Sequence, residues 1–328
     1  MSGLRKPDKS INRAREIFMS TAYRYLVFEG GLYRQNVLFD FIEDVGGAVV
    51  QKSVIGLDLV VFFAIPPEDE QYVREVASVL KGKIKDAPLL GCEIALVSPT
   101  VTRHHTPHPV CDISEYLRRY GAKINMVGLA RGVGQRTAQL SGEEKKIIEE
   151  HDLAVFVLGN FEYCLLNKKH VLYKDLSIPV IVTGAPHLSS VPHSHSYVGG
   201  FGRICHRLKS AEEVSNLNKL VKAVADSLEN IRKEMSLDPL SASPILVTQE
   251  IERYVEEVSS ALAPAPLTLK VDGVRVKLDY DKFVSKIRKV PIGTRKLEEI
   301  AEIGRSAISN HILVKILPES LVGSVFSQ

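Results

Sequence analysis

The chain has 328 residues, of which 45% are hydrophobic, which is enough for more than one buried core, so we expect two or three domains. Its formal net charge of +3 belongs to the N-terminal arm, because the remaining residues sum to zero. That balance excludes the basic surface of a nucleic-acid-binding protein, and the lack of a long apolar run or signal sequence predicts a cytoplasmic protein without membrane segments.

Residues 1–22 form a basic arm, which we interpret as a tail or a docking element. The next unit, residues 23–100, shows the order strand, helix, strand, strand, helix, strand. Its strands are YRYLVFEGG, VVQKSV, LDLVVFFAIP and GCEIALVSP. This order predicts an α+β domain with the split βαβ topology of ferredoxin-like folds. Gly56 and Asp58 mark a hairpin between the two middle strands.

Residues 101–208 alternate helices with short apolar strands, including LAVFVLG and IPVIVTG. Continuous apolar runs of this kind are typical of strands covered on both faces, so we predict a doubly wound parallel α/β domain of the Rossmann or flavodoxin-like class. Ser141 with Glu144, and Asp112 with Glu115, have the spacing of capping boxes at helix starts.

Residues 209–328 begin with a long charged helix to about Glu234, followed by the Pro/Ser-rich break SLDPLSASP. A small α+β region of helix, hairpin and helix comes next, with Asp272-Gly273 at the hairpin turn. This region lacks cysteine, so we assign it to packing or partner contacts.

Potential metal ligands are concentrated in the middle of the chain. All four cysteines lie between Cys92 and Cys205, and nine of the ten histidines lie between His104 and His206. In RHHTPHPVCD, the prolines predict an extended segment that carries His104, His105 and His108 and ends with Cys111 just before a helix start at Asp112. The positive end of a helix favours the thiolate that a metal requires. The alternative is a loop whose imidazoles bond only to backbone.

Further candidates follow later strands of the predicted doubly wound sheet, whose carboxyl ends are where such folds bind ligands. Cys164 follows LAVFVLG, and His187 follows IPVIVTG. The segment SVPHSHSYVGGFGRICHR adds His193 and His195, while Gly199 and Gly200 would let the backbone approach a ligand closely. A Gly-rich surface loop with incidental histidines is the alternative, and we expect Cys92 to be buried and inert.

The loop GLARGVGQRT predicts an anion site. Gly132 and Gly134 free the backbone, and Arg131 and Arg136 supply charge. The dinucleotide fingerprint is incomplete, however, and the chain has no GxxxxGK[ST], HExxH, GxSxG, CxxC or CxxCxxC motif. These absences argue against a common nucleotide-binding enzyme, zinc protease, serine hydrolase or ferredoxin.

Five segments together resemble the methanogenesis marker protein 7 family, which is related to the McrC protein encoded with methyl-coenzyme M reductase. They are FEGGLYR, EDVGGAVVQKSVI, RHHTPHPVCDISEYLRRYGA, NMVGLARGVGQRTAQLS and GNFEYC, within residues 23–208. The resemblance implies a component of the complex that reductively activates that reductase. It also implies a complex iron–sulfur cluster related to those of nitrogenase assembly.

On this basis we expect a non-catalytic electron-transfer subunit that holds or shares an iron–sulfur cluster, with Cys111 and Cys164 as sulfur ligands. Its partners would be methyl-coenzyme M reductase and its activation proteins, among them McrC, other methanogenesis marker proteins and an ATPase component. Two alternatives stay open. One is an α/β enzyme or binding protein for a phosphorylated or nucleotide ligand at GLARGVGQR, and the other is a cofactor-free scaffold subunit.

Overall fold

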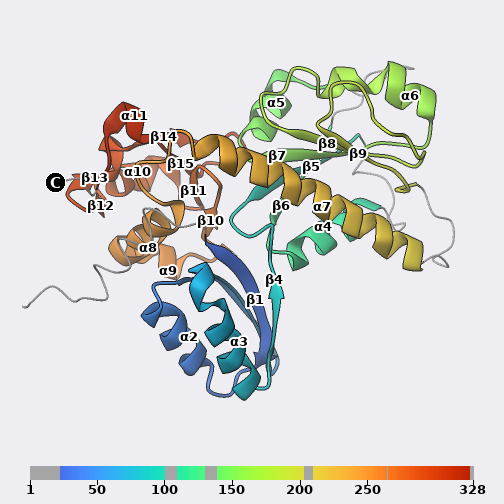
Figure 1. Cartoon of the computed structure of the whole chain (residues 1–328). Helices are drawn as coiled ribbons and strands as arrows, with labels where there is room; N and C mark the ends of the chain where they lie inside the picture. Colours follow the sequence, from blue (N-terminus) through green and yellow to red (C-terminus); the bar gives the residue numbers. More distant parts are fainter. Residues whose placement is uncertain (1–22, 100–108, 130–138, 203–209, 264, 326–328) are drawn as a thin grey trace, which may run out of the picture.

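The computed structural model describes residues 23–99, 109–129, 139–202, 210–263 and 265–325. Within these ranges the chain builds a mixed α/β fold from a five-stranded parallel sheet, two four-stranded antiparallel sheets and one two-stranded sheet. The predicted class is therefore confirmed. Figure 1 shows the N-terminal sheet in blue, the parallel sheet in green and the C-terminal sheet in orange to red. In the described part of the chain, no helix is both long and apolar enough to cross a membrane.

The N-terminal sheet has the strand order β2-β3-β1-β4, with every neighbouring pair antiparallel, as in ferredoxin-like folds. Two helices cover one face and bury Leu38, Ile42, Val73 and Ala77 against it. The elements are β1 (Arg24–Gly31), α2 (Gln35–Asp44), β2 (Ala48–Ile55), β3 (Asp58–Ile65), the 3-10 turn Pro67–Asp69, α3 (Glu70–Val79) and β4 (Lys83–Asp86).

One strand of the sequence prediction belongs elsewhere. The segment GCEIALVSP contains β5 (Glu93–Ser98), which joins the parallel sheet, whereas the short β4 takes the fourth place in the N-terminal sheet. All six residues of β5 are buried, whereas β4 is a largely exposed edge strand. Burial of β5 on both faces is typical of a central parallel strand. The assignment of GCEIALVSP to the ferredoxin-like unit was therefore wrong.

The parallel sheet has the order β6-β5-β7-β8-β9, which is the flavodoxin-like order. We call the edge where its strands begin the amino edge and the edge where they end the carboxyl edge. Its elements are β5, α4 (Pro109–Arg119), β6 (Lys123–Gly128), α5 (Gly142–Glu149), β7 (Leu153–Val157), α6 (Glu162–Asn167), the 3-10 turn Lys169–Leu172, β8 (Val180–Thr183) and β9 (Ser196–Val198).

Helices cover both faces of this sheet. One face packs on α4 and on the long α7 (Ser210–Met235), through residues such as Ile113, Leu117, Leu220 and Val224. The opposite face packs on α5 and α6, where Ile148 and Leu165 are buried. The doubly wound arrangement was therefore predicted correctly from the apolar strands.

The two predicted helix starts have different outcomes. Ser141 and Glu144 form the reciprocal capping box expected for α5. The box predicted at Asp112 was wrong, because α4 is already helical from Pro109 and Asp112 lies inside its first turn. Proline is favoured at the first helical position, because an N–H at that position has no partner within the helix and its absence costs nothing. Cys111 consequently belongs to the helix and does not precede it.

The C-terminal region packs a four-stranded antiparallel sheet, β10-β11-β15-β14, against its own helices. The expected hairpin is present between Leu269 and Val274. The elements are α8 (Pro244–Tyr254), α9 (Glu256–Ser260), β10 (Leu267–Leu269), β11 (Gly273–Val276), α10 (Tyr280–Arg288), β12 (Pro291–Ile292), β13 (Arg295–Lys296), the 3-10 turn Leu297–Glu299, β14 (Ala301–Arg305), β15 (Ile312–Ile316) and α11 (Glu319–Val322).

A buried ion pair fixes the C-terminal sheet to the amino edge of the parallel sheet. Arg275 on β11 donates from Nε to both carboxylate oxygens of Glu93 on β5, at 2.9 and 3.0 Å. Its Nη1 donates to Glu150 at 3.0 Å and to Ser306 at 2.6 Å. Arg275 and Glu93 are both almost fully buried. Burial alone would raise the pKa of Glu93, but its hydrogen bonds and charge pairing with Arg275 lower it.

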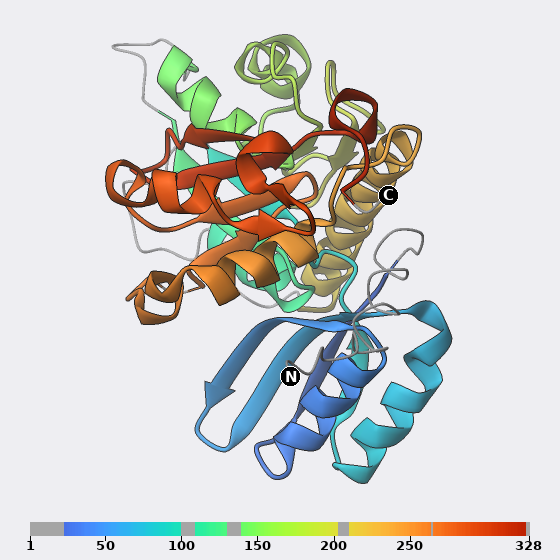
Figure 2. The ribbon, with the colours of Figure 1, turned by 90° about the vertical axis from the view of Figure 1, so that its left-hand side faces the viewer.

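The N-terminal sheet joins the other two parts through the face that its helices leave open. Ala48 and Ala64 on that face pack against Ile245 of α8 and Leu269 of β10. Figure 2 shows this sheet beneath the parallel and C-terminal sheets. All three parts therefore meet at the amino edge of the parallel sheet, and the carboxyl edge is left facing away from the junction.

Candidate functional site

The carboxyl edge has the geometry that open α/β sheets use for ligands. The strand order reverses at β5, which lies between β6 and β7. From β5 the chain leads to α4, and from β7 it leads to α6, which lie on opposite faces of the sheet. A crevice at such a reversal, beyond the ends of two neighbouring strands, is the usual ligand position of this fold class.

Cys111 and Cys164 lie on the two helices that flank this reversal. Cys111 is exposed in the first turn of α4, and Cys164 is half-buried in the first turn of α6, where its N–H bonds to the Phe161 carbonyl at 3.1 Å. Both thiols are therefore near helix N-termini at the same edge of the sheet. Cys92, by contrast, is fully buried and its Sγ donates to the Leu89 carbonyl at 3.0 Å, as expected for an inert position.

His187 follows β8 at the carboxyl edge and lines a cavity of about 370 Å³ between β9 and α7. Gly199 and Gly200 lie beside it. A Cβ atom on Gly199 would be 2.5 Å from the Pro186 carbonyl, and one on Gly200 would be 2.2 Å from the Asn216 amide. Gly200 also has a φ of +87°, which favours glycine. The close approach made by these two glycines is to neighbouring protein groups.

His193 and His195 lie at the other edge of the sheet. His195 directly precedes β9, its N–H donates to the Val180 carbonyl at 2.8 Å, and its ring Nδ1 accepts from the Val180 N–H at 3.0 Å. The His193 ring stacks near that of His170, with centroids 5.5 Å apart. Because β8 and β9 begin here, the structure separates His193 and His195 from Cys111 and Cys164 by the length of the strands.

Seven predicted site residues lie outside the described residues, namely His104, His105, His108, Arg131, Gly132, Gly134 and Arg136. The same holds for Cys205 and His206. Among the residues that the structure describes, no three His, Cys, Asp or Glu side chains are grouped so that they could hold a metal ion.

A larger cavity, of about 660 Å³, lies at the amino edge and was not predicted from the sequence. Lys123, Lys277 and Arg118 line it, together with Gln51 on β2. The signal in the sequence that could have indicated this cavity was the presence of charged residues at the starts of largely apolar strands. Glu93 begins β5 and is followed by four apolar residues, and Lys123 begins β6. A buried or half-buried charge needs a partner or a ligand, which the strand pattern alone does not name.

The fold and the carboxyl edge define a flavodoxin-like α/β protein that carries a ferredoxin-like unit and a C-terminal α+β region, with two thiols at the carboxyl edge of its parallel sheet. The chain belongs to the methyl-coenzyme M reductase operon protein C family, whose sequence model matches residues 23–290. An uncharacterized protein of Methanocaldococcus jannaschii is 49% identical over 300 residues, which cover 92% of this chain and 96% of that protein. The resemblance found in the sequence is thus confirmed, and the family connects the chain with the methyl-coenzyme M reductase system of methanogenesis.

Proposed function

We propose that this chain is a component of the machinery that reductively activates methyl-coenzyme M reductase, and that its carboxyl edge contributes Cys111 and Cys164 to a shared iron–sulfur cluster. Family membership supports the first part of the proposal. The observation that carries the second is the position of both thiols in the first turns of α4 and α6, on either side of the strand-order reversal.

The donor set argues for sharing. Iron–sulfur clusters in proteins are ordinarily held by four cysteine thiolates, and replacement of thiolates by histidine is limited to particular cluster types. Two thiols lie at the carboxyl edge. Among the described residues, no three His, Cys, Asp or Glu side chains lie close enough together to hold a metal ion. The described residues do not fit a complete cluster site. They fit a partial one, which a neighbouring subunit or ligands outside the described residues would complete.

The first test uses the chain purified without oxygen together with its co-purifying subunits. We expect Cys111→Ala and Cys164→Ala each to lower the bound iron and acid-labile sulfide by more than about half, because loss of a ligand weakens metal binding strongly. The fold should persist, since neither thiol lies in a core. Iron and sulfide analysis with circular dichroism measures both effects.

Cys92→Ala is the matched control, because it removes a thiol that is buried away from the carboxyl edge. Its iron content should equal that of the wild type. If the two edge variants also keep all their iron and an unchanged electronic spectrum, the ligand assignment is wrong. A preparation without iron in every case would favour a cofactor-free scaffold.

The second test concerns partners, which we propose to be methyl-coenzyme M reductase and its activation proteins. Affinity purification of the tagged chain from anaerobic methanogen cells should recover them. The arm of residues 1–22 carries five basic residues against two acidic ones. If the arm docks on an acidic surface of a partner, higher salt or deletion of residues 1–20 should weaken the recovery of that partner. Isolation of the full-length chain as a partner-free monomer at low salt would refute the assembly. The basic residues are Arg5, Lys6, Lys9, Arg13 and Arg15.

A further inference from the structure

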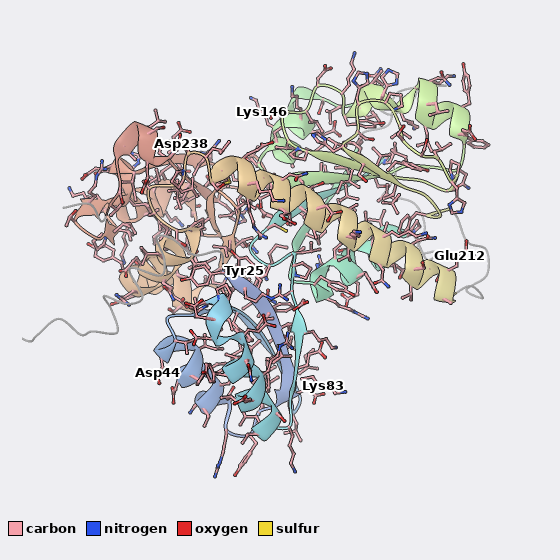
Figure 3. All side chains as sticks on the ribbon, viewed as in Figure 1. Tyr25, Asp44, Lys83, Lys146, Glu212 and Asp238 are labelled. Carbon is pink, nitrogen blue, oxygen red and sulfur yellow. The ribbon has the colours of Figure 1, made fainter. Side chains whose placement is uncertain are left out.

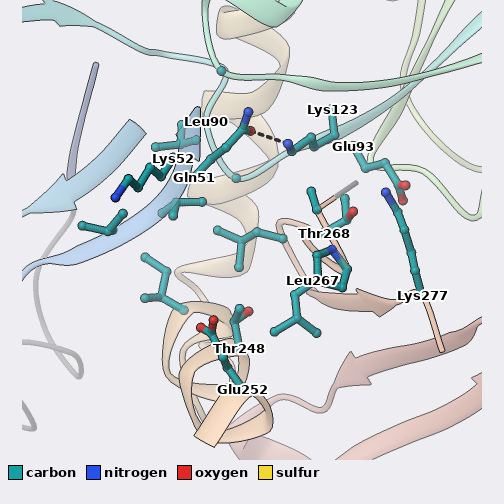
Figure 4. Close-up of a pocket in the computed structure, with 18 of the residues that line it drawn as sticks. Gln51, Lys52, Leu90, Glu93, Lys123, Thr248, Glu252, Leu267, Thr268 and Lys277 are labelled. Atoms are coloured by element: carbon teal, nitrogen blue, oxygen red, sulfur yellow. Dashed lines mark hydrogen bonds between the residues drawn. The ribbon is translucent and has the colours of Figure 1, made fainter. Parts of the chain in front are cut away.

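The cavity of about 660 Å³ at the amino edge is formed by all three parts of the fold. The N-terminal sheet contributes β2, the parallel sheet contributes the start of β6, and the C-terminal region contributes α8 and β10. Figure 4 shows the side chains of these elements around one space. Its volume is within the range of small-molecule sites, which often lie where domains meet.

Positive charge collects at one end of this cavity. Lys123 begins β6, Arg118 belongs to the last turn of α4, and Lys277 directly follows β11. The Lys123 ammonium donates a hydrogen bond to the Gln51 side-chain oxygen on β2 (Figure 4), and Arg118 donates to the Ile124 carbonyl at 3.2 Å. Within the described ranges, neither Lys123 nor Arg118 forms an ion pair with a carboxylate.

The acidic residues that line the cavity are Glu93 and Glu252. Glu93 is bound by Arg275, which donates to both of its carboxylate oxygens, and its charge also acts on Lys277. Glu252 belongs to α8, and Figure 4 shows it next to Thr248 on the wall opposite Lys123. Among the residues that the structure describes, no carboxylate therefore forms an ion pair with Lys123 or Arg118.

The pKa of Lys123 is affected first by burial and then by the neighbouring cations. Burial lowers its pKa to about 8, and the charges of Lys277 and Arg118 add to the effect. Burial also lowers the pKa of Lys277. Cations that are desolvated and repel one another in a cleft are stabilised when an anion binds between them.

The rest of the cavity wall mixes apolar and polar side chains. Leu90 comes from the segment that connects the N-terminal and parallel sheets, Ile245 from α8, and Leu267 from β10. Thr248 and Gln249 of α8 add polar groups. A ligand that reached the cationic end would therefore place its remaining atoms against both hydrocarbon and hydrogen-bonding groups, which suits an organic molecule.

We infer that this cavity binds a small organic anion, whose anionic group is held by Lys123, Lys277 and Arg118. The site lies at the amino edge, opposite Cys111 and Cys164, so it goes beyond the proposed function and stands or falls independently of it.

The test titrates the full chain with benzene disulfonate, whose charge does not change with pH, and measures binding by calorimetry. We expect Lys123→Gln and Lys277→Gln each to weaken binding about tenfold, because each removes a charge-assisted contact. Arg118→Gln should weaken it several-fold. Since Arg118 is exposed, that variant decides the matter if the lysine variants do not fold.

Lys146→Gln is the control, because Lys146 is an exposed lysine on α5 that does not line the cavity. Figure 3 shows Lys146 at the top of the view, away from the N-terminal sheet at the bottom. It should bind like the wild type, and neutral benzenesulfonamide should not bind the wild type. The proposal is overturned if the three cavity variants retain full affinity, if the dianion does not bind, or if a hexaglutamate peptide binds in its place, since that would indicate a peptide-docking cleft.

A pH series adds a readout that a general loss of stability would not reproduce. The charged groups that line the cavity with Lys123 are Lys52 of β2, Arg118 of α4, Glu93 of β5, Glu252 of α8 and Lys277 after β11. With a pKa of about 8, Lys123 loses its charge as the pH rises past that value. Wild-type affinity should thus fall between about pH 7 and pH 9.5, and Lys123→Gln should lose most of this dependence. An equal fall in both proteins would overturn the role of Lys123.

Discussion

Arg275→Met is expected to lower the free energy of unfolding by about 3–5 kcal/mol, because it leaves the Glu93 carboxylate buried without its counter-charge. The Asn125 amide on the neighbouring strand β6 would still donate to Glu93, at 2.8 Å, but it is uncharged. Urea unfolding followed by circular dichroism measures the change, as the chain has no tryptophan. Two comparisons test the cause. Arg253→Met, which breaks an exposed pair with Glu250, should cost less than about 1 kcal/mol.

The second comparison is the double variant Arg275→Met with Glu93→Leu. Removing both charges should recover much of the stability, because a buried ion pair and an apolar pair of similar volume often stabilise a protein equally. If the double variant is as unstable as the sum of two single variants, the loss comes from packing and not from an unpaired charge.

The same variant should change how stability depends on pH. In the wild type the pKa of Glu93 lies below its usual value of 4.5, so its stabilising contribution is present above that value and is lost as the pH falls. Without Arg275, burial dominates and raises the pKa, so the destabilisation is largest near neutral pH and shrinks on acidification. A destabilisation that is constant between about pH 4 and pH 7 would contradict this account.

Gly273→Ala is the second change with a large expected effect, a loss of about 3 kcal/mol or more. Gly273 begins β11, and a Cβ atom there would lie 1.9 Å from the Val314 carbonyl oxygen and 3.2 Å from the Lys315 Cα. Both atoms belong to the backbone of β15, which β14 holds on its other side, so β15 cannot yield without breaking the sheet. Thermal unfolding measures the loss.

Gly304→Ala provides the control in the same sheet. Gly304 lies on β14, and nothing is within 4 Å of the position where its Cβ would be. Alanine there should change stability by no more than about 0.5 kcal/mol. Equal effects at the two positions would show that the cost comes from the loss of glycine in a strand and not from contact with β15.

Local patterns were enough to predict much of this fold. Apolar strands that alternate with helices indicated the doubly wound sheet, and Ser141 with Glu144 indicated the start of α5. The Asp272-Gly273 pair correctly indicated a hairpin, although Gly273 is needed for its closeness to Val314, which no local rule reveals. Strand β5 was misplaced because only a few residues separate it from β4, so the sequence offers no clear boundary between the two sheets.

The candidate site was harder to predict than the fold. Cys164 and His187 were expected at one edge of the sheet and lie there, because strand ends are readable from the sequence. Cys111 was expected before a helix start but lies inside the first turn of α4. The edge at which His195 lies could not be predicted, because it depends on where the three-residue strand β9 begins. The cavity around Lys123 is formed by residues from three separate parts of the chain, so no local pattern could indicate it.

Helix α7 has mechanical consequences for these two edges. Its 26 residues make a rod about 39 Å long, and Asn216 near its start touches Gly200 at the carboxyl edge. Near its other end, Arg232 donates to the Leu90 carbonyl at 3.1 Å and lies over the Tyr25 ring at 4.8 Å. Leu90 lines the cavity at the amino edge. One continuous helix therefore connects the carboxyl edge with the wall of the cavity at the amino edge, so a change in its tilt would move both edges together.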